Sequence, residues 1–325
     1  MELTFVVAAD CGLDYHFNLF LRTKQAAGRR PRTLEWYSEV MRCYLQATAA
    51  FDRNWPPTVE HCLTFFEALT ARGLGDYTRN NYYRALRGFL NWSFRCGFLA
   101  QNPLDFVDAP KAPRPLPKAP PMEDVARFLA TVSQGTGTEW RDARDLALFS
   151  LALDSGARIG ELSRLRLPDI DPFNWQVRVY GQKDNKERIV EIGDTTAVEL
   201  SKWLRQRAGL SLPLPLRRGH LFVSDYQEKG FRPFTIWGMR LRLKFWQARA
   251  GIPHFNFHAF RHAYAVYSLR NGADLMDVRD QLGHSSIKTT AIYTQVVNDG
   301  RQARHRKTSP RGNLPRGEHV KRVDL

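Results

Sequence analysis

Apolar residues recur at helical spacing through roughly the first third of the chain. In LDYHFNLFLRTKQ the repeat runs through Leu13, Phe17, Phe20 and Leu21, which is the pattern of an amphipathic helix. Three further stretches repeat it: TLEWYSEVMRCYLQATAAF through Trp36, Val40, Cys43 and Tyr44; TVEHCLTFFEALTARG, closed by Gly73; and YTRNNYYRALRGFLNWSFRCG through Tyr82, Leu86, Phe89, Leu90 and Phe94. The pattern predicts an all-helical first domain over residues 10–107.

The second part of the chain mixes helical and strand periods. EDVARFLATV and RDARDLALFSLALDSG have helical spacing, whereas WQVRVYG and KERIVEIG alternate apolar and polar residues on either side of QKDN. This alternation predicts a β-hairpin, and HLFVSD predicts one more short strand. From Phe234 onward the pattern is helical again. We therefore expect a mainly α domain with a small β-sheet, an α+β domain, over residues 122–298.

The segment DAPKAPRPLPKAPP, residues 108–121, separates these two regions. It holds six prolines, and proline both fixes φ and removes a backbone donor, so a packed helix cannot persist there. The segment also carries Lys111, Arg114 and Lys118. We interpret it as an extended basic linker between two domains; the alternative is an ordered loop inside a single domain.

Composition narrows the class of protein. A chain of 325 residues with 43% hydrophobic residues has room for two folded domains. Its formal net charge of +15 and pI near 9.9 favour nucleic acid or an anionic membrane surface as a partner. No apolar run approaches the roughly twenty residues that a membrane-spanning helix needs, so no membrane insertion is expected. The tail, residues 299–325, is strongly basic and either holds the DNA backbone loosely or is simply solvated.

The N-terminus and the cysteines bear on location. MELTFVVAADCGLDY is acidic where a signal peptide is basic, and its apolar run is too short for one. The four cysteines are scattered and form no CxxC pair, so they read as reduced core thiols. Together these features predict a cytoplasmic, nucleoid-associated protein.

Arginines gather on the fourth helical stretch of the first domain. Arg79, Arg84 and Arg87 lie around its apolar face, with Asn80 and Asn81 near its start. Guanidinium and amide groups suit phosphate oxygens and base edges, so these three arginines are candidate DNA contacts. A solvated helix face would have a similar composition.

The stretch HAFRHA places His258 and His262 four residues apart, a spacing that can hold zinc on a helix. The glutamate that follows the first histidine in zinc proteases is missing, no third ligand stands nearby in sequence, and an arginine lies between the two histidines. Neither a P-loop nor a GxGxxG, GxSxG or HExxH pattern occurs in the chain. We therefore expect no metal and no nucleotide cofactor.

Breaking a DNA phosphodiester without a metal requires cations on the phosphate, a nucleophile and a proton donor for the departing oxygen. Arg158 follows the turn DSGA at the start of a helix, and Arg261 lies one helical turn after His258. His284 follows a glycine in LGHSS, and Tyr293 comes nine residues later. Lys183 is predicted at the tip of the hairpin. Taken singly, each of these residues has an ordinary structural explanation.

As an ordered series these residues resemble the tyrosine recombinase, or phage integrase, family. The series comprises Arg158-Ile-Gly-Glu161-Leu162, GQKDNKER, His258-x-x-Arg261-His262, Leu282-Gly283-His284-Ser285 and Tyr293. GADLMDVRDQLGHSSIKTTAIYTQV is similar to a family block almost residue for residue. TRNNYYRALRGFLNWSFRCGFLAQNP resembles the last helices of the family's core-binding domain. Within the family the chain looks most like the recombinases that resolve chromosome dimers.

The resemblance implies a role for the two arginines and the tyrosine. Arg158 and Arg261 would grip the scissile phosphate, and Glu161 would orient the first arginine. Tyr293 would attack the phosphorus, forming a 3′-phosphotyrosyl bond and freeing a 5′ hydroxyl. No metal or ATP is implied, because the phosphotyrosyl ester conserves the energy needed to rejoin the strand.

The remaining site residues follow from the same resemblance. Lys183 would donate a proton to the leaving oxygen; Lys186 remains the alternative, because GQKDNKER is one residue longer than the usual GKGNKER hairpin. His258 would help position the phosphate and shuttle the tyrosine proton. His284 would hydrogen-bond a phosphate oxygen, and His262 would give structural support.

The implied fold is a C-shaped clamp on duplex DNA, in which a SAM-like helical core-binding domain and a catalytic domain cover opposite faces. The implied partners are double-stranded recombination sites and other copies of the chain. Copies would form a homo-tetramer on DNA that exchanges strands through a Holliday junction, with a monomer expected free in solution. Two alternatives stay open here: a type IB-like topoisomerase, and a DNA-binding protein without catalytic activity.

Overall fold

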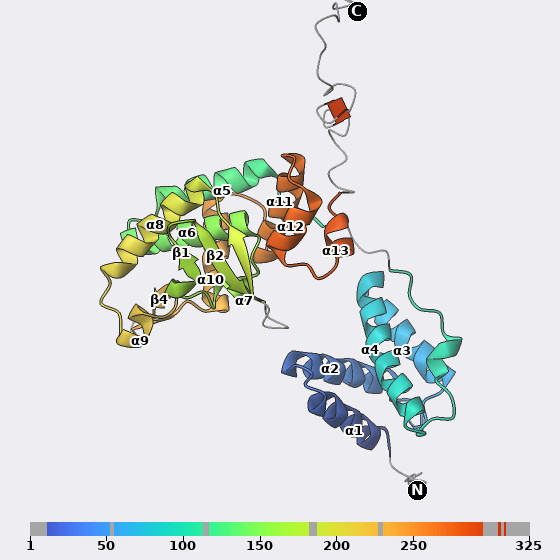
Figure 1. Cartoon of the computed structure of the whole chain (residues 1–325). Helices are drawn as coiled ribbons and strands as arrows, with labels where there is room; N and C mark the ends of the chain where they lie inside the picture. The colour runs from blue at the N-terminus through green and yellow to red at the C-terminus, as the bar shows by residue number, and fades with distance from the viewer. Residues whose placement is uncertain are drawn as a thin grey trace, which may run out of the picture. The chain divides into compact units, whose positions relative to one another are not determined.

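The computed structural model describes residues 12–52, 55–112, 117–181, 187–226 and 230–294, together with residues 305, 306 and 309. The chain divides into two compact units, Met1–Pro115 and Leu116–Leu325, and the division falls inside the proline-rich segment 108–121. Figure 1 shows the elements of each unit. The domain limits predicted from the sequence, 10–107 and 122–298, stay predictions.

The first unit is helical, as predicted. Its elements are α1 (Leu13–Ala26), α2 (Pro31–Ala47), α3 (Val59–Ala71), α4 (Asp76–Arg95) and a 3₁₀ helix at Pro103–Phe106. Local signals set several of the starts: Pro31 stands in the first turn of α2, where its missing N–H costs nothing. The side chain of Thr58 caps α3 by accepting from the backbone N–H of His61.

Aromatic side chains fill the core of the first unit. Phe20, Phe65 and Phe89 are fully buried, and the rings of Phe20 and Phe89 meet edge to face at 5.4 Å. Each such side chain contributes on the order of 1.5–3 kcal/mol by leaving water. The predicted apolar face of α4 is correct except at Phe94, which is 48% exposed. The last turn of α4 instead directs Trp92 inward, where its ring packs against Phe98.

Only part of the cysteine prediction is correct. Cys62 is buried in the helical core, but Cys43 is half-buried and Cys96 is exposed at the residue that follows α4. All three are free thiols, and Cys11 lies outside the described residues. Cys96 is the residue that follows the last turn of α4, and its side chain faces solvent there.

The second unit is mainly helical with two small antiparallel sheets, one of three strands and one of two, which confirms the predicted α+β class. Its helices are α5 (Met122–Gln134), α6 (Glu139–Ser155), α7 (Ile159–Leu162), α8 (Asp194–Ala208), α9 (Leu214–Arg217), α10 (Ile236–Ala250), α11 (Phe257–Arg270), α12 (Leu275–Leu282) and α13 (Ile287–Ala291), with a 3₁₀ helix at Leu167–Asp169. Its strands are β1 (Ile170–Asp171), β2 (Gln176–Tyr180), β3 (Glu187–Glu191), β4 (Val223–Asp225) and β5 (Phe231–Pro233). Helices α8 and α9 and strands β1 and β5 were not predicted.

The predicted hairpin supplies β2 and β3 of the three-stranded sheet, whose order is β1-β2-β3 with β2 in the middle. Val177 pairs with Val190 and Val179 with Arg188; the three valines are fully buried, as the alternation of side chains requires. Residues 182–186, which include the predicted hairpin tip, lie outside the described part of the chain. Trp203 of α8 is fully buried in the same core, and its indole N–H donates to the Leu221 carbonyl at 3.1 Å.

A buried carboxylate joins α6 to α10. Asp145 accepts hydrogen bonds from the neighbouring Arg144 at 2.6 and 2.9 Å, and from Arg242 and the Trp246 indole at 2.6 and 2.8 Å. A buried charge needs several partners to be tolerated. We therefore interpret this cluster as a structural link between the two helices.

Both ends of the proline-rich segment are anchored to the unit they adjoin. Asn80 of α4 donates to the Pro110 carbonyl at 2.8 Å, and the Tyr267 hydroxyl of α11 donates to the Pro120 carbonyl at 3.0 Å. The described residues on either side of the gap at 113–116 form neither helix nor strand. Among the residues that the structure describes, no helix is long and apolar enough to cross a membrane.

Candidate active site

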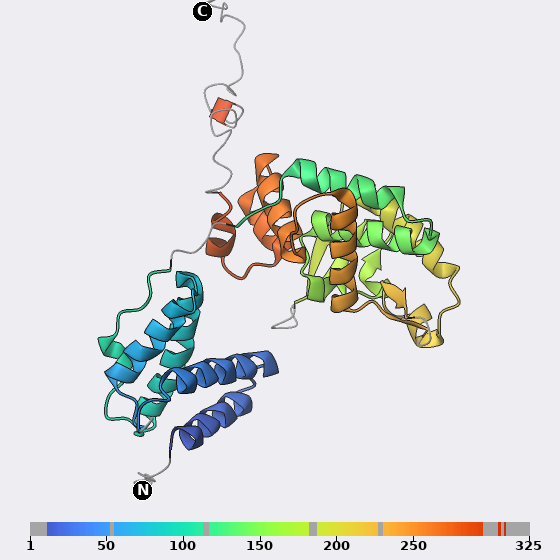
Figure 2. The same ribbon diagram turned by 180° about the vertical axis from the view of Figure 1, so that it is seen from behind.

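The predicted catalytic residues that the structure describes come from α7, α11 and the turns on either side of α13, and from no element of the first unit. Helices α11, α12 and α13 lie side by side in both views (Figures 1 and 2), and α11 also packs on α6. Helix α7 adjoins β2, and α12 adjoins β3. These contacts bring together segments that are more than a hundred residues apart in the chain.

Arg158 stands at the N-cap of the short helix α7, directly after the turn that ends α6. Gly156 in that turn has φ +58°, and a Cβ there would lie 2.6 Å from Leu282 Cδ2; only glycine fits both conditions. Glu161 reaches back and accepts from the Arg158 backbone N–H at 2.8 Å and from its guanidinium at 2.9 Å. The side chain of Arg158 is 38% exposed. Glu161 therefore orients it, and part of it remains open to solvent.

Arg261 is almost completely buried in α11, with 1% of its surface exposed. Its guanidinium donates to the Gly156 carbonyl at 2.9 Å and to the Leu282 carbonyl at 2.6 Å. It thereby links the turn before Arg158 to the end of α12. Burial, followed by the charges of Arg158 and Arg188, lowers the pKa of Arg261 to about 9, so the group is still a cation at neutral pH.

Glu161 is the buried anion among these cations. It accepts from Arg188 at 2.8 and 3.3 Å in addition to its bonds with Arg158. Burial alone would raise the pKa of Glu161, but the hydrogen bonds and charge of Arg188, with a smaller contribution from Arg158, outweigh it and lower the pKa. The carboxylate is therefore ionised and holds both arginines.

Arg188 is a site residue that the sequence analysis did not single out. Besides Glu161, it donates to the Gln281 carbonyl at 2.9 Å, so it joins β3, α7 and the end of α12. Gly283 lets this side chain pass: its φ is +65°, and a Cβ there would lie 2.8 Å from Arg188 Cδ. The only signal in the sequence was its place at the end of GQKDNKER.

The histidines predicted for the site surround these cations. His258 is solvent-accessible in the first turn of α11, yet the protein packed around its ring, followed by Arg261 and Arg158, lowers its pKa. His284 lies in the turn between α12 and α13 and shares a 2.9 Å hydrogen bond with the Thr290 hydroxyl. Burial, then Arg261 and Arg158, lowers the pKa of His284 to about 3. Both imidazoles are therefore neutral at neutral pH.

Tyr293 lies in the turn that follows α13 and is 2% exposed. Its ring packs in a small apolar cluster with Val266, Val278 and Leu282. Its hydroxyl shares a 2.8 Å hydrogen bond with His262 Nδ1.

The structure thus brings together six predicted residues in one cluster: Arg158, Glu161, His258, Arg261, His284 and Tyr293. His262, predicted only as support, contacts the phenol directly. Lys183 and its alternative Lys186 lie outside the described residues. The site therefore holds more guanidinium groups than anions, together with neutral imidazoles and a phenol. Such a site is suited to bind an anion such as a phosphodiester and to stabilise the charge that develops on it.

The phage integrase family matches residues 121–299, which contain this cluster. The tyrosine recombinase XerC of Chromobacterium violaceum is 32% identical to the chain over 309 residues, covering 91% of this chain and 97% of that protein. The chain belongs to the phage integrase family.

Solved members with this fold include proteins crystallised on DNA. One is the XerH recombinase bound to a palindromic difH substrate in a post-cleavage complex, with a TM-score of 0.69, 20% identity and coverage of 85% of this chain and 79% of that one. Another is a lambda integrase tetramer bound to a Holliday junction, with a TM-score of 0.66, 14% identity and coverage of 86% and 79%. At these identities the likeness establishes the fold.

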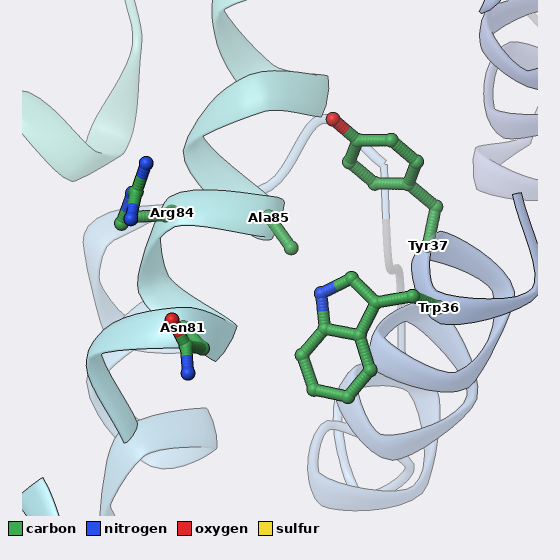
Figure 3. A pocket seen from close by; sticks show the side chains of 5 residues that line it. All are labelled: Trp36, Tyr37, Asn81, Arg84 and Ala85. Atoms are coloured by element: carbon green, nitrogen blue, oxygen red, sulfur yellow. The ribbon is translucent and has the colours of Figure 1, made fainter. Parts of the chain in front are cut away.

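The helical unit of this phage integrase family member has a pocket of its own between α2 and α4. Trp36 and Tyr37 extend from α2, and Asn81, Arg84 and Ala85 of α4 form the opposite wall (Figure 3). Arg84, one of the predicted DNA contacts, is exposed at this pocket. The residues that line the pocket are therefore two aromatics, an asparagine, an arginine and an alanine.

The other predicted DNA contacts are partly engaged within the protein. Arg79 forms an ion pair with Asp76 and donates to the Thr70 hydroxyl at 2.6 Å. Arg87 forms an exposed ion pair with Asp105 at 3.2 Å. Surface pairs of this kind are weak, so a phosphate could replace the carboxylate. The linker residues Lys111 and Lys118 are exposed, and Arg114 lies outside the described residues.

Proposed function

We propose that this protein is a tyrosine site-specific recombinase that cuts and rejoins duplex DNA through a 3′-phosphotyrosyl intermediate. The observation that carries the proposal is the cluster in which the Tyr293 hydroxyl bonds His262, the residue after Arg261, with Arg158 and neutral histidines in the same site. Membership of the phage integrase family and the similarity to a tyrosine recombinase XerC support it.

Arg261 and Arg158 grip the scissile phosphate in this proposal. Arg261 is held rigidly by two backbone carbonyls, and Glu161 orients Arg158 from the other side. Guanidiniums fixed before the reaction stabilise the charge that develops on the phosphoryl oxygens without a cost of reorganisation. His258 and His284, neutral at neutral pH, can each donate one ring N–H to a phosphate oxygen.

Tyr293 is the nucleophile. Its hydroxyl oxygen forms a bond to phosphorus while the bond from phosphorus to the 5′ oxygen breaks, and religation reverses these steps. Because the phenol is buried in the free protein, the turn after α13 has to shift when DNA is loaded. A five-residue helix precedes this turn, so the shift can be local.

In this proposal the helical unit and the linker contact the duplex through their cations. Arg79, Arg84 and Arg87 are the candidate contacts of the helical unit, and Lys111, Arg114 and Lys118 are those of the linker. Their cations would neutralise backbone phosphates. Four copies would assemble on two sites and exchange strands through a four-way junction.

A suicide substrate tests this function. Duplexes selected for binding from a randomised library supply the site, which is then rebuilt with a nick beside the cleavage position so that the freed 5′-hydroxyl fragment diffuses away. We expect a covalent protein–DNA complex that survives denaturation, with the DNA joined through its 3′ phosphate, and recombinant products from two intact sites. A bound but never covalently attached substrate would overturn the proposal.

Lys183 is proposed as the acid that protonates the 5′ oxygen. Lys183→Ala should slow covalent-complex formation by about 10²–10⁴, the usual contribution of a general acid. A substrate with a 5′-thio leaving group, which needs little protonation, should restore the rate of this variant. Lys186→Ala is the matched control; if it shows the loss and the thio rescue instead, the assignment passes to Lys186.

A further inference from the structure

The nucleophile has a partner that the family resemblance left with a supporting role. His262 Nδ1 lies 2.8 Å from the Tyr293 hydroxyl, in the range of a good hydrogen bond. His262 follows Arg261 directly and lies one helical turn after His258, whose ring meets it edge to face at 4.6 Å. The imidazole therefore contacts both the phenol of Tyr293 and the ring of His258.

His262 is in the protonation state that a proton acceptor needs. Burial, followed by His258 and Arg261, lowers the pKa of His262 to about 4, so the ring is neutral at neutral pH. A neutral imidazole has one ring nitrogen with a free lone pair. With its hydrogen on Nε2, Nδ1 accepts the hydrogen bond of the phenol.

The surroundings of Tyr293 exclude water as the acceptor in this position. The residue is 2% exposed, and its ring contacts the side chains of an apolar cluster. A phenol has an ordinary pKa near 10, so its proton has to pass to another group as the oxygen attacks. The nitrogen at hydrogen-bond distance is placed to receive it.

We propose that His262, and not His258 as the resemblance implies, is the catalytic residue whose ring nitrogen, Nδ1, accepts the phenol proton of Tyr293 during attack on the phosphodiester. The proposal deepens the recombinase function above and rests on it. As the bond from the phenol oxygen to phosphorus forms, the phenol O–H bond breaks and its proton moves to Nδ1. The bond from phosphorus to the 5′ oxygen breaks with its electron pair, and that oxygen is protonated by the separate acid. On religation His262 returns the proton to the phenol.

DNA binding should make His262 a stronger base. The titratable and charged groups that face it are His258 and Arg261 on its own helix and Tyr293 on the segment after α13. A phosphodiester on Arg261 offsets part of the positive charge that now holds the pKa of His262 down. In this proposal the local shift of the turn after α13 that brings the phenol to the phosphate leaves its oxygen within reach of His262 Nδ1.

His262→Asn separates holding the phenol from accepting its proton. The asparagine Oδ1 lies near the position of Nδ1 and can accept the phenol hydrogen bond, but the amide cannot take up the proton. His262→Ala removes both functions. His254→Asn is the matched control, because His254 bonds Gln247 outside the site. Covalent-complex formation is measured for each variant on the suicide substrate at saturating DNA, between about pH 5 and pH 8.

We expect His262→Asn to keep the wild-type melting temperature and DNA affinity and to form the covalent complex about 10²–10⁴ more slowly. A base must be unprotonated, so the wild-type rate should fall as the pH drops through the pKa of His262 in the complex. His262→Asn should lose this acid limb, and His254→Asn should retain it. A wild-type rate and pH profile in His262→Asn would overturn the proposal, as would a loss of rate with the acid limb intact. Failure of the wild-type protein to form any covalent complex would instead count against the recombinase function itself.

Discussion

Tyr293→Phe is expected to abolish the covalent protein–DNA complex while leaving folding and DNA binding unchanged. The substitution removes one oxygen from a residue that is 2% exposed and keeps the ring that packs against Val266 and Leu282. Without that oxygen the site has no atom at this position that can bond to phosphorus, so the loss should be complete.

The cost to stability should be small. The variant loses the hydrogen bond to His262 Nδ1, which contributes about 0.5–1.5 kcal/mol to the free energy of unfolding. The experiment compares the two proteins on the suicide substrate by denaturing gel, on the intact duplex by gel shift, and by thermal unfolding. Residual covalent complex at the same DNA position would show that another group is the nucleophile.

Among the cations of the site, substitution of Arg261 should cause the largest loss in the rate of covalent-complex formation. Arginines that stabilise phosphoryl transfer contribute about 10³–10⁵ in rate, and Arg261→Lys keeps the charge but loses the forked geometry. The same change leaves the Gly156 and Leu282 carbonyls without their donors. Each unsatisfied buried carbonyl costs about 1–3 kcal/mol, so this variant should also unfold at a lower temperature.

Arg158→Lys is the matched variant that separates chemistry from stability. The side chain of Arg158 is 38% exposed, and its bonds go to Glu161, which keeps Arg188 as a partner. We therefore expect a large loss of covalent-complex formation with a nearly unchanged melting temperature. If the cleavage rates of Arg261→Lys and Arg158→Lys fell only in proportion to their melting temperatures, both arginines would be structural and not catalytic.

The helices and the central hairpin could be predicted because their signals are local. The apolar repeat through Leu13, Phe17 and Phe20, and the alternation in WQVRVYG, each describe one face of one element. Phe94 and Cys96 were misjudged where α4 ends, because the end of a helix, and not its period, decides which side chains there turn inward. Helix α8 was missed although it carries the fully buried Trp203.

The ordered motifs in the sequence determined the family and the types of residue in the site: two arginines, a carboxylate, histidines and a tyrosine in a fixed order along the chain. Tertiary structure alone decided how they are held. The bonds from Arg261 to the Gly156 and Leu282 carbonyls, from Arg188 to Glu161, and between Tyr293 and His262 join residues 21–105 positions apart. No local period encodes such contacts, because they depend on which helices pack together and on the glycine turns that let the chains approach.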